Sequence, residues 1–132
     1  MQPQQRITQE LVISGGPARL IVMEGPQAGQ KFKIDGDVVL GRAIDSSVVI
    51  EDPEVSRSHV RITRSPSGAY IIEDMASRNG TRVNGLPIQK QSLIFGDNIQ
   101  IGPRVLILFA PFDPIEDQLL QRQRLEALGR SL

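Results

Sequence analysis

The chain has 132 residues, no cysteine, and equal numbers of basic and acidic residues, so its formal net charge at pH 7 is zero. Its length corresponds to one domain, and its neutrality argues against general nucleic-acid binding, which depends on neutralising phosphates with cations. Without cysteine it has no disulfide framework, and its longest apolar run, Val105 to Ala110, is too short to cross a bilayer, so we expect a cytoplasmic protein without membrane contact.

Residues 1–18 are interpreted as a flexible N-terminal tail, because they are polar and rich in glutamine and end in Ser14-Gly15-Gly16-Pro17. The only threonine in this tail is Thr8, and its neighbours are polar residues of the kind that kinases reach. Thr8 is therefore a candidate phosphorylation site.

Ten short segments between residues 19 and 110 have the character of β-strands. Most are rich in Val, Ile and Leu, and the connections between them carry Gly, Pro, Asn and Ser. Residues 59–64 alternate with period two, as a half-buried strand does, and Asn84-Gly85 is a strong hairpin signal. Many short strands without an intervening helix predict an all-β sandwich. The ten segments are residues 19–24, 31–35, 38–41, 48–51, 59–64, 69–74, 81–83, 87–89, 98–101 and 104–110.

Residues 111–132 are predicted to contain a C-terminal α-helix. Asp113 stands at the cap, Pro114 at the first helical position, and Glu116 three residues after the cap, the spacing of a capping box. Two interpretations stay open: the helix packs along the edge of the sandwich, or it is a signalling linker that dimerises as a coiled coil. Its apolar residues recur at helical spacing and are Ile115, Leu119, Leu120, Leu125, Leu128 and Leu132.

Three polar runs interrupt the predicted strands. They are Gly41-Arg42, Ser56-Arg57-Ser58-His59 and Ser77-Arg78-Asn79-Gly80-Thr81. Each supplies a guanidinium fork, a hydroxyl, or a turn whose backbone N–H groups can point at an anion. Arginine, the cation best suited to bidentate recognition of phosphate, supplies every basic residue except Lys31, Lys33 and Lys90.

In this order, with strands between them and Asn84-Gly85 after them, the runs resemble the forkhead-associated (FHA) domain, a module that reads phosphothreonine. The resemblance covers about residues 19–110 and implies an eleven-stranded sandwich of two sheets with its binding loops at one end. The phosphothreonine-binding residues that it implies are Arg42, Ser56, Arg57, Arg78 and Asn79. The supporting residues that it implies are Gly41, His59, Gly80, Asn84 and Gly85.

The resemblance implies a signalling module and not an enzyme. We expect it to couple a Ser/Thr kinase to a phosphothreonine-containing partner protein, or to bind its own tail after phosphorylation of Thr8. Members of this family are often joined to other domains, so the resemblance also suggests that the chain is the N-terminal part of a longer protein such as a diguanylate cyclase. A further possibility that it suggests is an inhibitor of a metabolic enzyme. The helix after residue 110 could join two copies in a dimer.

Two rival interpretations are open to the sequence. The first is a scaffold that binds proteins without phosphate. The second is a hydrolase with Ser56 as nucleophile, His59 as base and Asp74 as orienting acid, but the chain has a single histidine and no Gly-x-Ser-x-Gly motif. We therefore expect no catalytic residues. The acids are scattered and no His or Cys cluster exists, so we also expect no metal and no cofactor.

Overall fold

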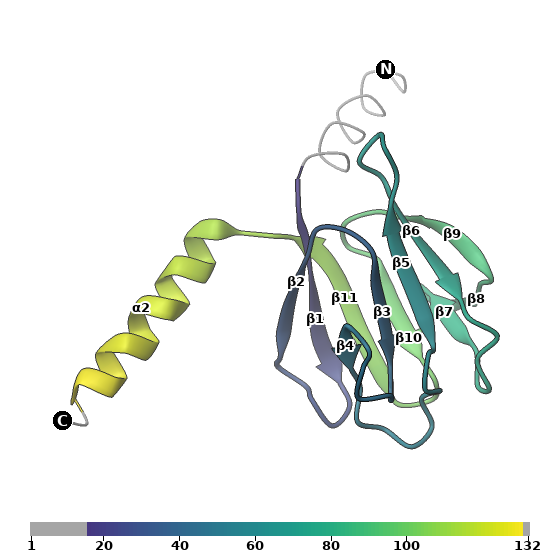
Figure 1. Ribbon diagram of the computed structural model, residues 1–132, viewed down its shortest axis with the longest axis horizontal. Helices are drawn as coiled ribbons and strands as arrows, with labels where there is room; N and C mark the ends of the chain where they lie inside the picture. Colours follow the sequence, from purple (N-terminus) through teal and green to yellow (C-terminus); the bar gives the residue numbers. More distant parts are fainter. Residues whose placement is uncertain (1–15, 131–132) are drawn as a thin grey trace.

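The computed structural model describes residues 16–130, which form a sandwich of two β-sheets followed by a helix (Figure 1). The six-stranded sheet contains, in spatial order, β2 (Lys31–Ile34), β1 (Ala18–Glu24), β11 (Val105–Pro111), β10 (Asn98–Ile101), β7 (Thr81–Val83) and β8 (Leu86–Pro87). The five-stranded sheet contains β4 (Val48–Val49), β3 (Val38–Gly41), β5 (Val60–Arg64), β6 (Tyr70–Asp74) and β9 (Lys90–Leu93).

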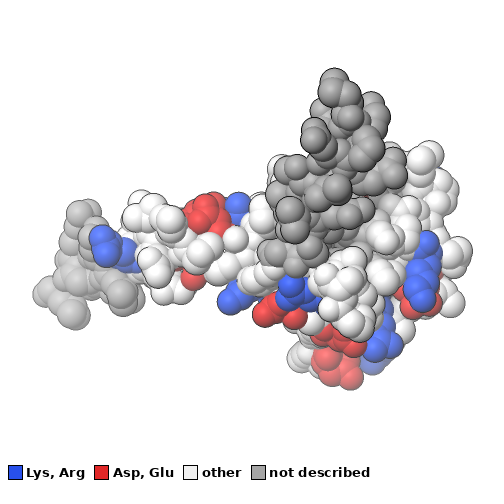
Figure 2. All heavy atoms as spheres, turned by 90° about the horizontal axis from the view of Figure 1, so that it is seen from above, with Lys and Arg blue, Asp and Glu red and all other residues white. Residues whose placement is uncertain are grey.

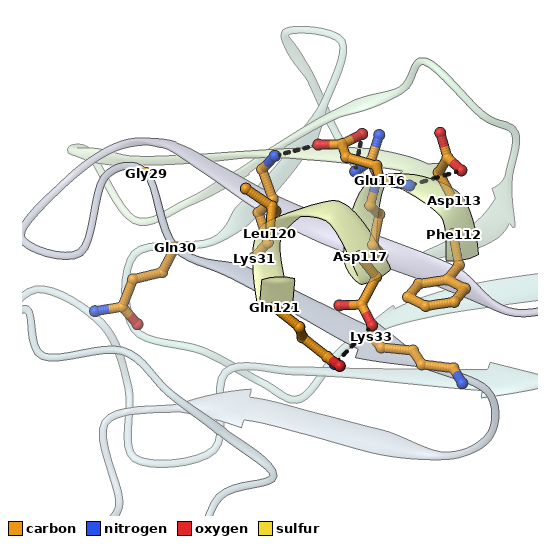
Figure 3. A pocket seen from close by; sticks show the side chains of 11 residues that line it. Gly29, Gln30, Lys31, Lys33, Phe112, Asp113, Glu116, Asp117, Leu120 and Gln121 are labelled. Atoms are coloured by element: carbon orange, nitrogen blue, oxygen red, sulfur yellow. Dashed lines mark hydrogen bonds and ion pairs between the residues drawn. The ribbon is translucent and has the colours of Figure 1, made fainter. Parts of the chain in front are cut away.

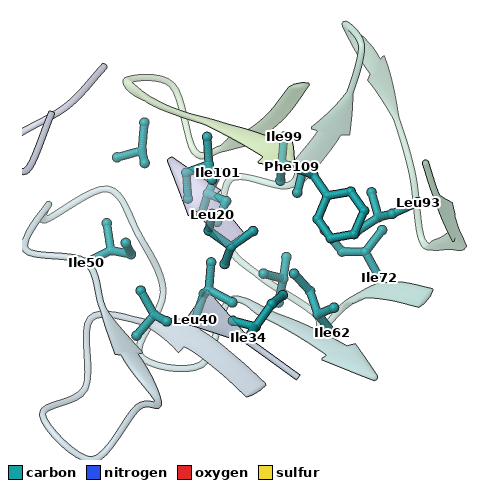
Figure 4. Packing of buried hydrophobic residues seen from close by; sticks show 14 of the residues in the cluster. Leu20, Ile34, Leu40, Ile50, Ile62, Ile72, Leu93, Ile99, Ile101 and Phe109 are labelled. Atoms are coloured by element: carbon teal, nitrogen blue, oxygen red, sulfur yellow. The ribbon is translucent and has the colours of Figure 1, made fainter. Parts of the chain in front are cut away.

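The core lies between the two sheets and is built from alternate residues of their strands. Leu20 in β1 and Ile107 in β11 are fully buried, while their chain neighbours are partly exposed, and Phe109 is fully buried near the end of β11. The rings of Tyr70 and Phe109 meet edge to face, with centroids 5.2 Å apart, and so join the two sheets. Figure 4 shows aliphatic side chains from both sheets closing around Phe109.

The predicted all-β sandwich with eleven strands and a C-terminal helix is confirmed, but sequence patterning missed β9. Lys90, Gln91 and Ser92 are all exposed, and only Leu93 points into the core. The strand pairs with β6 alone, at the edge of its sheet. An edge strand with a single buried residue has almost no apolar alternation, which explains why it was missed.

The two ends of the sandwich carry different parts of the chain. At one end β1 begins beside the end of β11: Ala18 pairs with Pro111, and the N–H of Phe112 donates to the carbonyl of Pro17 at 3.1 Å. At the opposite end, which we call the loop end, lie the connections 42–47, 50–59, 75–80 and 102–104 (Figure 1).

Both outer sheet faces combine charged and apolar side chains. The outer face of the five-stranded sheet carries Arg61, which forms an ion pair with Asp37. The outer face of the six-stranded sheet carries Ile21, Leu106 and Leu108 at its centre, all partly exposed. On the face seen in Figure 2, the described basic and acidic residues are mixed.

Helix α2 (Pro114–Arg130) starts at the predicted cap. The Asp113 carboxylate accepts hydrogen bonds from the N–H groups of Ile115 (3.0 Å) and Glu116 (3.2 Å). The expected capping box is wrong in one respect: the Glu116 carboxylate turns to the six-stranded sheet and forms ion pairs with Arg19 (2.9 Å) and Lys31 (2.6 Å). These long-range pairs also lower the pKa of Glu116, with Lys31 the larger influence.

Only the start of α2 lies against the sandwich. A hollow of about 550 Å³ separates its first two turns from the β1–β2 edge, with Lys31 and Gln30 on one side and Leu120 and Gln121 on the other (Figure 3). Beyond these turns the helix extends away from the domain (Figure 1). Packing along the sandwich edge is therefore restricted to the helix start. Among residues 16–130, no helix has the length and apolar character needed to cross a bilayer.

Candidate functional site

The first two polar runs meet at the loop end because Gly41 has no side chain. A Cβ atom at position 41 would lie 2.1 Å from the carbonyl oxygen of Arg57, so no larger residue fits without a backbone shift. The close approach lets the N–H of Arg42 donate to the carbonyl of Ser56 (3.0 Å), and the N–H of Ala43 to that of Arg57 (3.1 Å). Gly41 thereby holds Arg42 beside Ser56.

His59 joins the second run to the third from inside the domain. Its imidazole is fully buried; Nδ1 accepts a hydrogen bond from the N–H of Ser56 (3.0 Å), so Nε2 carries the proton and donates to the carbonyl of Gly80 (2.8 Å). Burial lowers the pKa of His59, opposed by the bond to Gly80 and the nearby Asp74. Because backbone groups occupy both ring nitrogens, His59 cannot take a proton from Ser56, and the hydrolase alternative is wrong.

Asp74 fixes the turn that carries the third run. One carboxylate oxygen accepts from the hydroxyls of Ser77 (2.5 Å) and Thr81 (2.6 Å), and the other from the N–H of Ser77 (3.0 Å). Burial would raise the pKa of Asp74, but these hydrogen bonds outweigh it and the pKa is lowered. The turn includes Ala76 at φ 51°, a strained angle for a residue with a side chain.

The role of Asp74 was missed, because sequence reasoning considered this residue only as part of a hydrolase. A usable signal is the Asp-x-x-Ser spacing of Asp74 and Ser77, since an aspartate often accepts bonds from groups a few residues further along.

The structure brings the predicted phosphate-binding groups together on neighbouring loops. The Ser56 hydroxyl oxygen accepts from the N–H of Arg78 (2.9 Å), which leaves the hydroxyl proton available to an anion. Arg42 is steadied by a bond from Nε to the carbonyl of Val55 (3.1 Å). Arg42, Arg57 and Arg78 are exposed, and within residues 16–130 none of their guanidinium groups forms an ion pair with an acid. The cluster therefore carries uncompensated positive charge.

Asn79 sits beside this cluster, but its side chain is engaged within the protein. Its amide nitrogen donates to the backbone carbonyl (2.8 Å) and the carboxylate (3.0 Å) of Glu54. The loop around Glu54 is anchored by buried Asp52, which forms a two-pronged bond with Arg104. Bonding to Arg104 is the main reason that the pKa of Asp52 is lowered. Local sequence patterns gave no sign of this anchor, because 52 residues separate its two side chains.

The remaining predicted residues have supporting positions or lie outside the description. Gly80 takes φ 81°, which the turn before β7 requires. Asn84 and Gly85 form the turn between β7 and β8 at φ 51° and 84°, and the Asn84 side chain bonds Asp97 and the N–H of Asn98. Thr8 lies outside the described residues. Within residues 16–130, no cluster of His, Asp or Glu suited to a metal ion is found.

Comparison with known proteins adds independent evidence. Residues 38–102 match the model of a family described as "FHA domain". Over 101 residues the chain is 38% identical to the glycogen accumulation regulator GarA of Mycolicibacterium smegmatis, covering 75% of this chain and 63% of GarA. Over 99 residues it is 38% identical to the oxoglutarate dehydrogenase inhibitor of Corynebacterium efficiens, covering 74% of this chain and 69% of the inhibitor.

A solved structure is also similar. It belongs to a structural and functional analysis of phosphothreonine-dependent FHA domain interactions, and it superposes with a TM-score of 0.65 at 28% identity. The match covers 74% of this chain and 98% of that chain. The present chain thus spans about three fifths of the length of GarA and nearly all of this compact structure.

Proposed function

The chain belongs to the FHA-domain family, and on that premise we propose that it binds phosphothreonine in a partner protein. The observation that carries the proposal is the cluster of Arg42, Ser56 and Arg78 on loops fixed by buried groups, where among residues 16–130 no acid pairs with the two guanidinium groups and no acceptor takes the Ser56 hydroxyl proton. The solved structure from the work on phosphothreonine-dependent interactions gives further support.

In this proposal the phosphate dianion lies between the guanidinium groups of Arg42, Arg57 and Arg78. Arg42 donates from its terminal nitrogens while its Nε keeps the bond to Val55, and Ser56 donates its hydroxyl proton. Hydrogen bonds to charged groups contribute about 1.5–3 kcal/mol each. Two or three such bonds, with the peptide contacts, are enough for micromolar affinity, about −8 kcal/mol.

Asn79 has to exchange its partner when the peptide binds. Its amide now bonds Glu54, whereas the family resemblance assigns it to the main chain of the ligand. A hollow of about 450 Å³ opens next to Asn79, between Arg82 and Gln100, and offers room for the peptide beyond the phosphothreonine. The Glu54 carboxylate at this position would disfavour acidic peptide residues.

We further propose that the protein acts by binding and not by catalysis, in the cytoplasm and downstream of a Ser/Thr kinase. Its relatives are named as a regulator of glycogen accumulation and as an inhibitor of oxoglutarate dehydrogenase. A metabolic enzyme is therefore a reasonable class of partner. These relatives give no support to a diguanylate cyclase as the parent protein, and we do not retain that interpretation.

Binding of the chain's own tail, phosphorylated at Thr8, has to satisfy the geometry of the sandwich. The tail joins β1 at Ala18, at the end opposite the binding loops, and β1 has seven residues, a length of about 24 Å. The roughly ten residues from Thr8 to Ala18 have an r.m.s. reach of only about 17 Å if flexible. Docking in the same molecule therefore needs a nearly extended tail, and docking on a second molecule is favoured.

Calorimetry with one peptide in threonine, phosphothreonine and phosphoserine forms tests the proposal. We expect the phosphothreonine peptide to bind far more strongly than the other two forms. Arg42→Ala should weaken its binding free energy by about 2 kcal/mol, because a charge-assisted bond is removed. Arg61→Ala, which removes an exposed arginine of the five-stranded sheet, is the matched control and should bind as the parent does. Equal affinity for plain and phosphorylated peptide would favour the phosphate-independent scaffold instead.

A further inference from the structure

The outer face of the six-stranded sheet has an apolar centre. The period-two alternation that buries Leu20 and Ile107 turns Ile21 and Leu108 outward, and these two residues are direct partners in the β1–β11 register. Leu106 lies on the same face, and Met23 beside it is 51% exposed. We call these four residues the sheet patch. Exposed apolar clusters of this kind mark interaction surfaces.

Helix α2 carries a second apolar surface, which no part of residues 16–130 covers. Ile115 and Leu119 stand one turn apart and are 68% and 52% exposed, and Leu120 is 41% exposed. An isolated helix of 17 residues is only marginally stable in water, and most helices in proteins depend on packing of an apolar face. Only the first two turns of α2 lie against the domain, so the helix needs a further surface (Figure 3).

The helix of the same molecule is poorly placed to cover the sheet patch. Glu116 bonds Arg19 and Lys31 and thereby holds the helix start over the β1–β2 edge. From there α2 runs away from the domain (Figure 1). Laying it across β11 would break both ion pairs. An arm that projects in this way can reach the sheet of another molecule with its own anchor intact.

We propose that two copies of the chain exchange their helices, each α2 packing on the sheet patch of the other copy. Ile115 and Leu119 would cover Ile21 and Leu108. Helical spacing places Ile115 and Leu119 on the face of α2 opposite Asp117, which lines the hollow beside the chain's own sheet, so the anchor and the exchange use different faces of the helix. The sheet patch lies on the flank of the sandwich, so the dimer would leave both loop ends open, and it does not depend on phosphate binding.

Disulfide trapping tests this dimer directly, because the chain has no cysteine of its own. A chain with Leu108→Cys is mixed with a chain with Leu119→Cys under mild oxidation. We expect a disulfide-linked heterodimer as the main product. Leu86→Cys, at an equally large but separate exposed leucine on β8, replaces Leu108→Cys in the control and should give much less product.

Three other products would overturn the proposal, each in favour of a different arrangement. A preferred Leu119–Leu119 link would indicate a coiled coil of two helices. A link within one chain carrying both Leu108→Cys and Leu119→Cys would show that α2 folds back on its own sheet. A link within one chain carrying Val12→Cys and Leu108→Cys would assign the patch to the N-terminal segment.

Sedimentation of the unmodified chain provides the second measurement. We expect a concentration-dependent dimer, and we expect Leu119→Glu to raise its dissociation constant on the order of tenfold or more, the effect of losing one buried anchor. Leu86→Glu is the control, and circular dichroism checks that each variant folds. A monomer at all concentrations, or equal effects of the two substitutions, would overturn the exchange of helices.

Discussion

The loop end of the sandwich and helix α2 are fixed to the domain in opposite ways. At the loop end, buried or half-buried groups bind the backbone of neighbouring loops: His59 joins Ser56 to Gly80, and Asp74 holds Ser77. The helix is held by its cap and by one partly exposed carboxylate, Glu116. A site for a small, highly charged group gains from groups already in position, whereas an arm that meets a partner gains from freedom to adjust.

Replacing Gly41 with alanine should have the largest effect. The new Cβ would clash with the Arg57 carbonyl, forcing apart the loops that carry Arg42 and Ser56, at a cost of about 3 kcal/mol in the free energy of unfolding. Gly36→Ala, where nothing lies within 4 Å of the added atom, is the control. Denaturant titration measures both, and equal stability would mean that the loop end is less rigid than described.

Removing the Asp74 carboxylate should come next. Asp74→Ala leaves the N–H and hydroxyl of Ser77 and the buried Thr81 hydroxyl without their acceptor, which we expect to cost about 2 kcal/mol of stability. Phosphopeptide affinity should fall as well, because the Ser77–Gly80 turn positions Arg78. Glu73→Ala, one residue earlier and exposed, should change neither quantity.

Acidification should weaken the loop end through His59. In the folded protein the pKa of His59 lies below the ordinary 6.5. As the pH falls below 6.5, the unfolded chain therefore takes up a proton that the folded protein still excludes. The free energy of unfolding decreases until the pH reaches the pKa of the folded state. The carboxyls of Asp52 and Asp74 contribute only in more acidic solution, below their ordinary 3.8. Denaturant midpoints between pH 7.5 and 5 measure the effect.

In His59→Gln this particular slope should disappear, although the variant is less stable throughout. A slope retained in the variant would assign the pH dependence to another group.

Releasing the helix start should have the smallest effect. Glu116→Gln removes both ion pairs, but their groups are partly open to solvent and hold only the helix start, so global unfolding should change little. Amide hydrogen exchange in the first turns of α2 should become faster, and added salt should have a similar effect on the parent chain. Asp117→Asn is the matched control. A clear loss of global stability would show that α2 belongs to the domain core after all.

The sequence predicted those features that depend on neighbours along the chain. Alternation in β5, the Asn84-Gly85 turn and the Asp113 cap are local patterns, and the structure contains all of them. Features decided by distant partners escaped prediction. Glu116 meets Arg19 and Lys31 across the fold instead of closing its capping box.

The candidate site shows the same division. The motif order placed Arg42, Ser56 and Arg78 on adjacent loops, because the family pattern records which loops meet. The pattern did not show that Asn79 bonds Glu54, because Glu54 is a loop residue outside the three polar runs.

The placement of the chain ends has a consequence for laboratory use. Ala18 and Pro111 lie side by side at the end opposite the loops. A sensor surface, a bead or a fluorescent protein attached beyond either residue would therefore leave the loop end facing solution. Several copies joined in tandem could present their loop ends to one multiply phosphorylated target, so that avidity would add to the affinity of a single site.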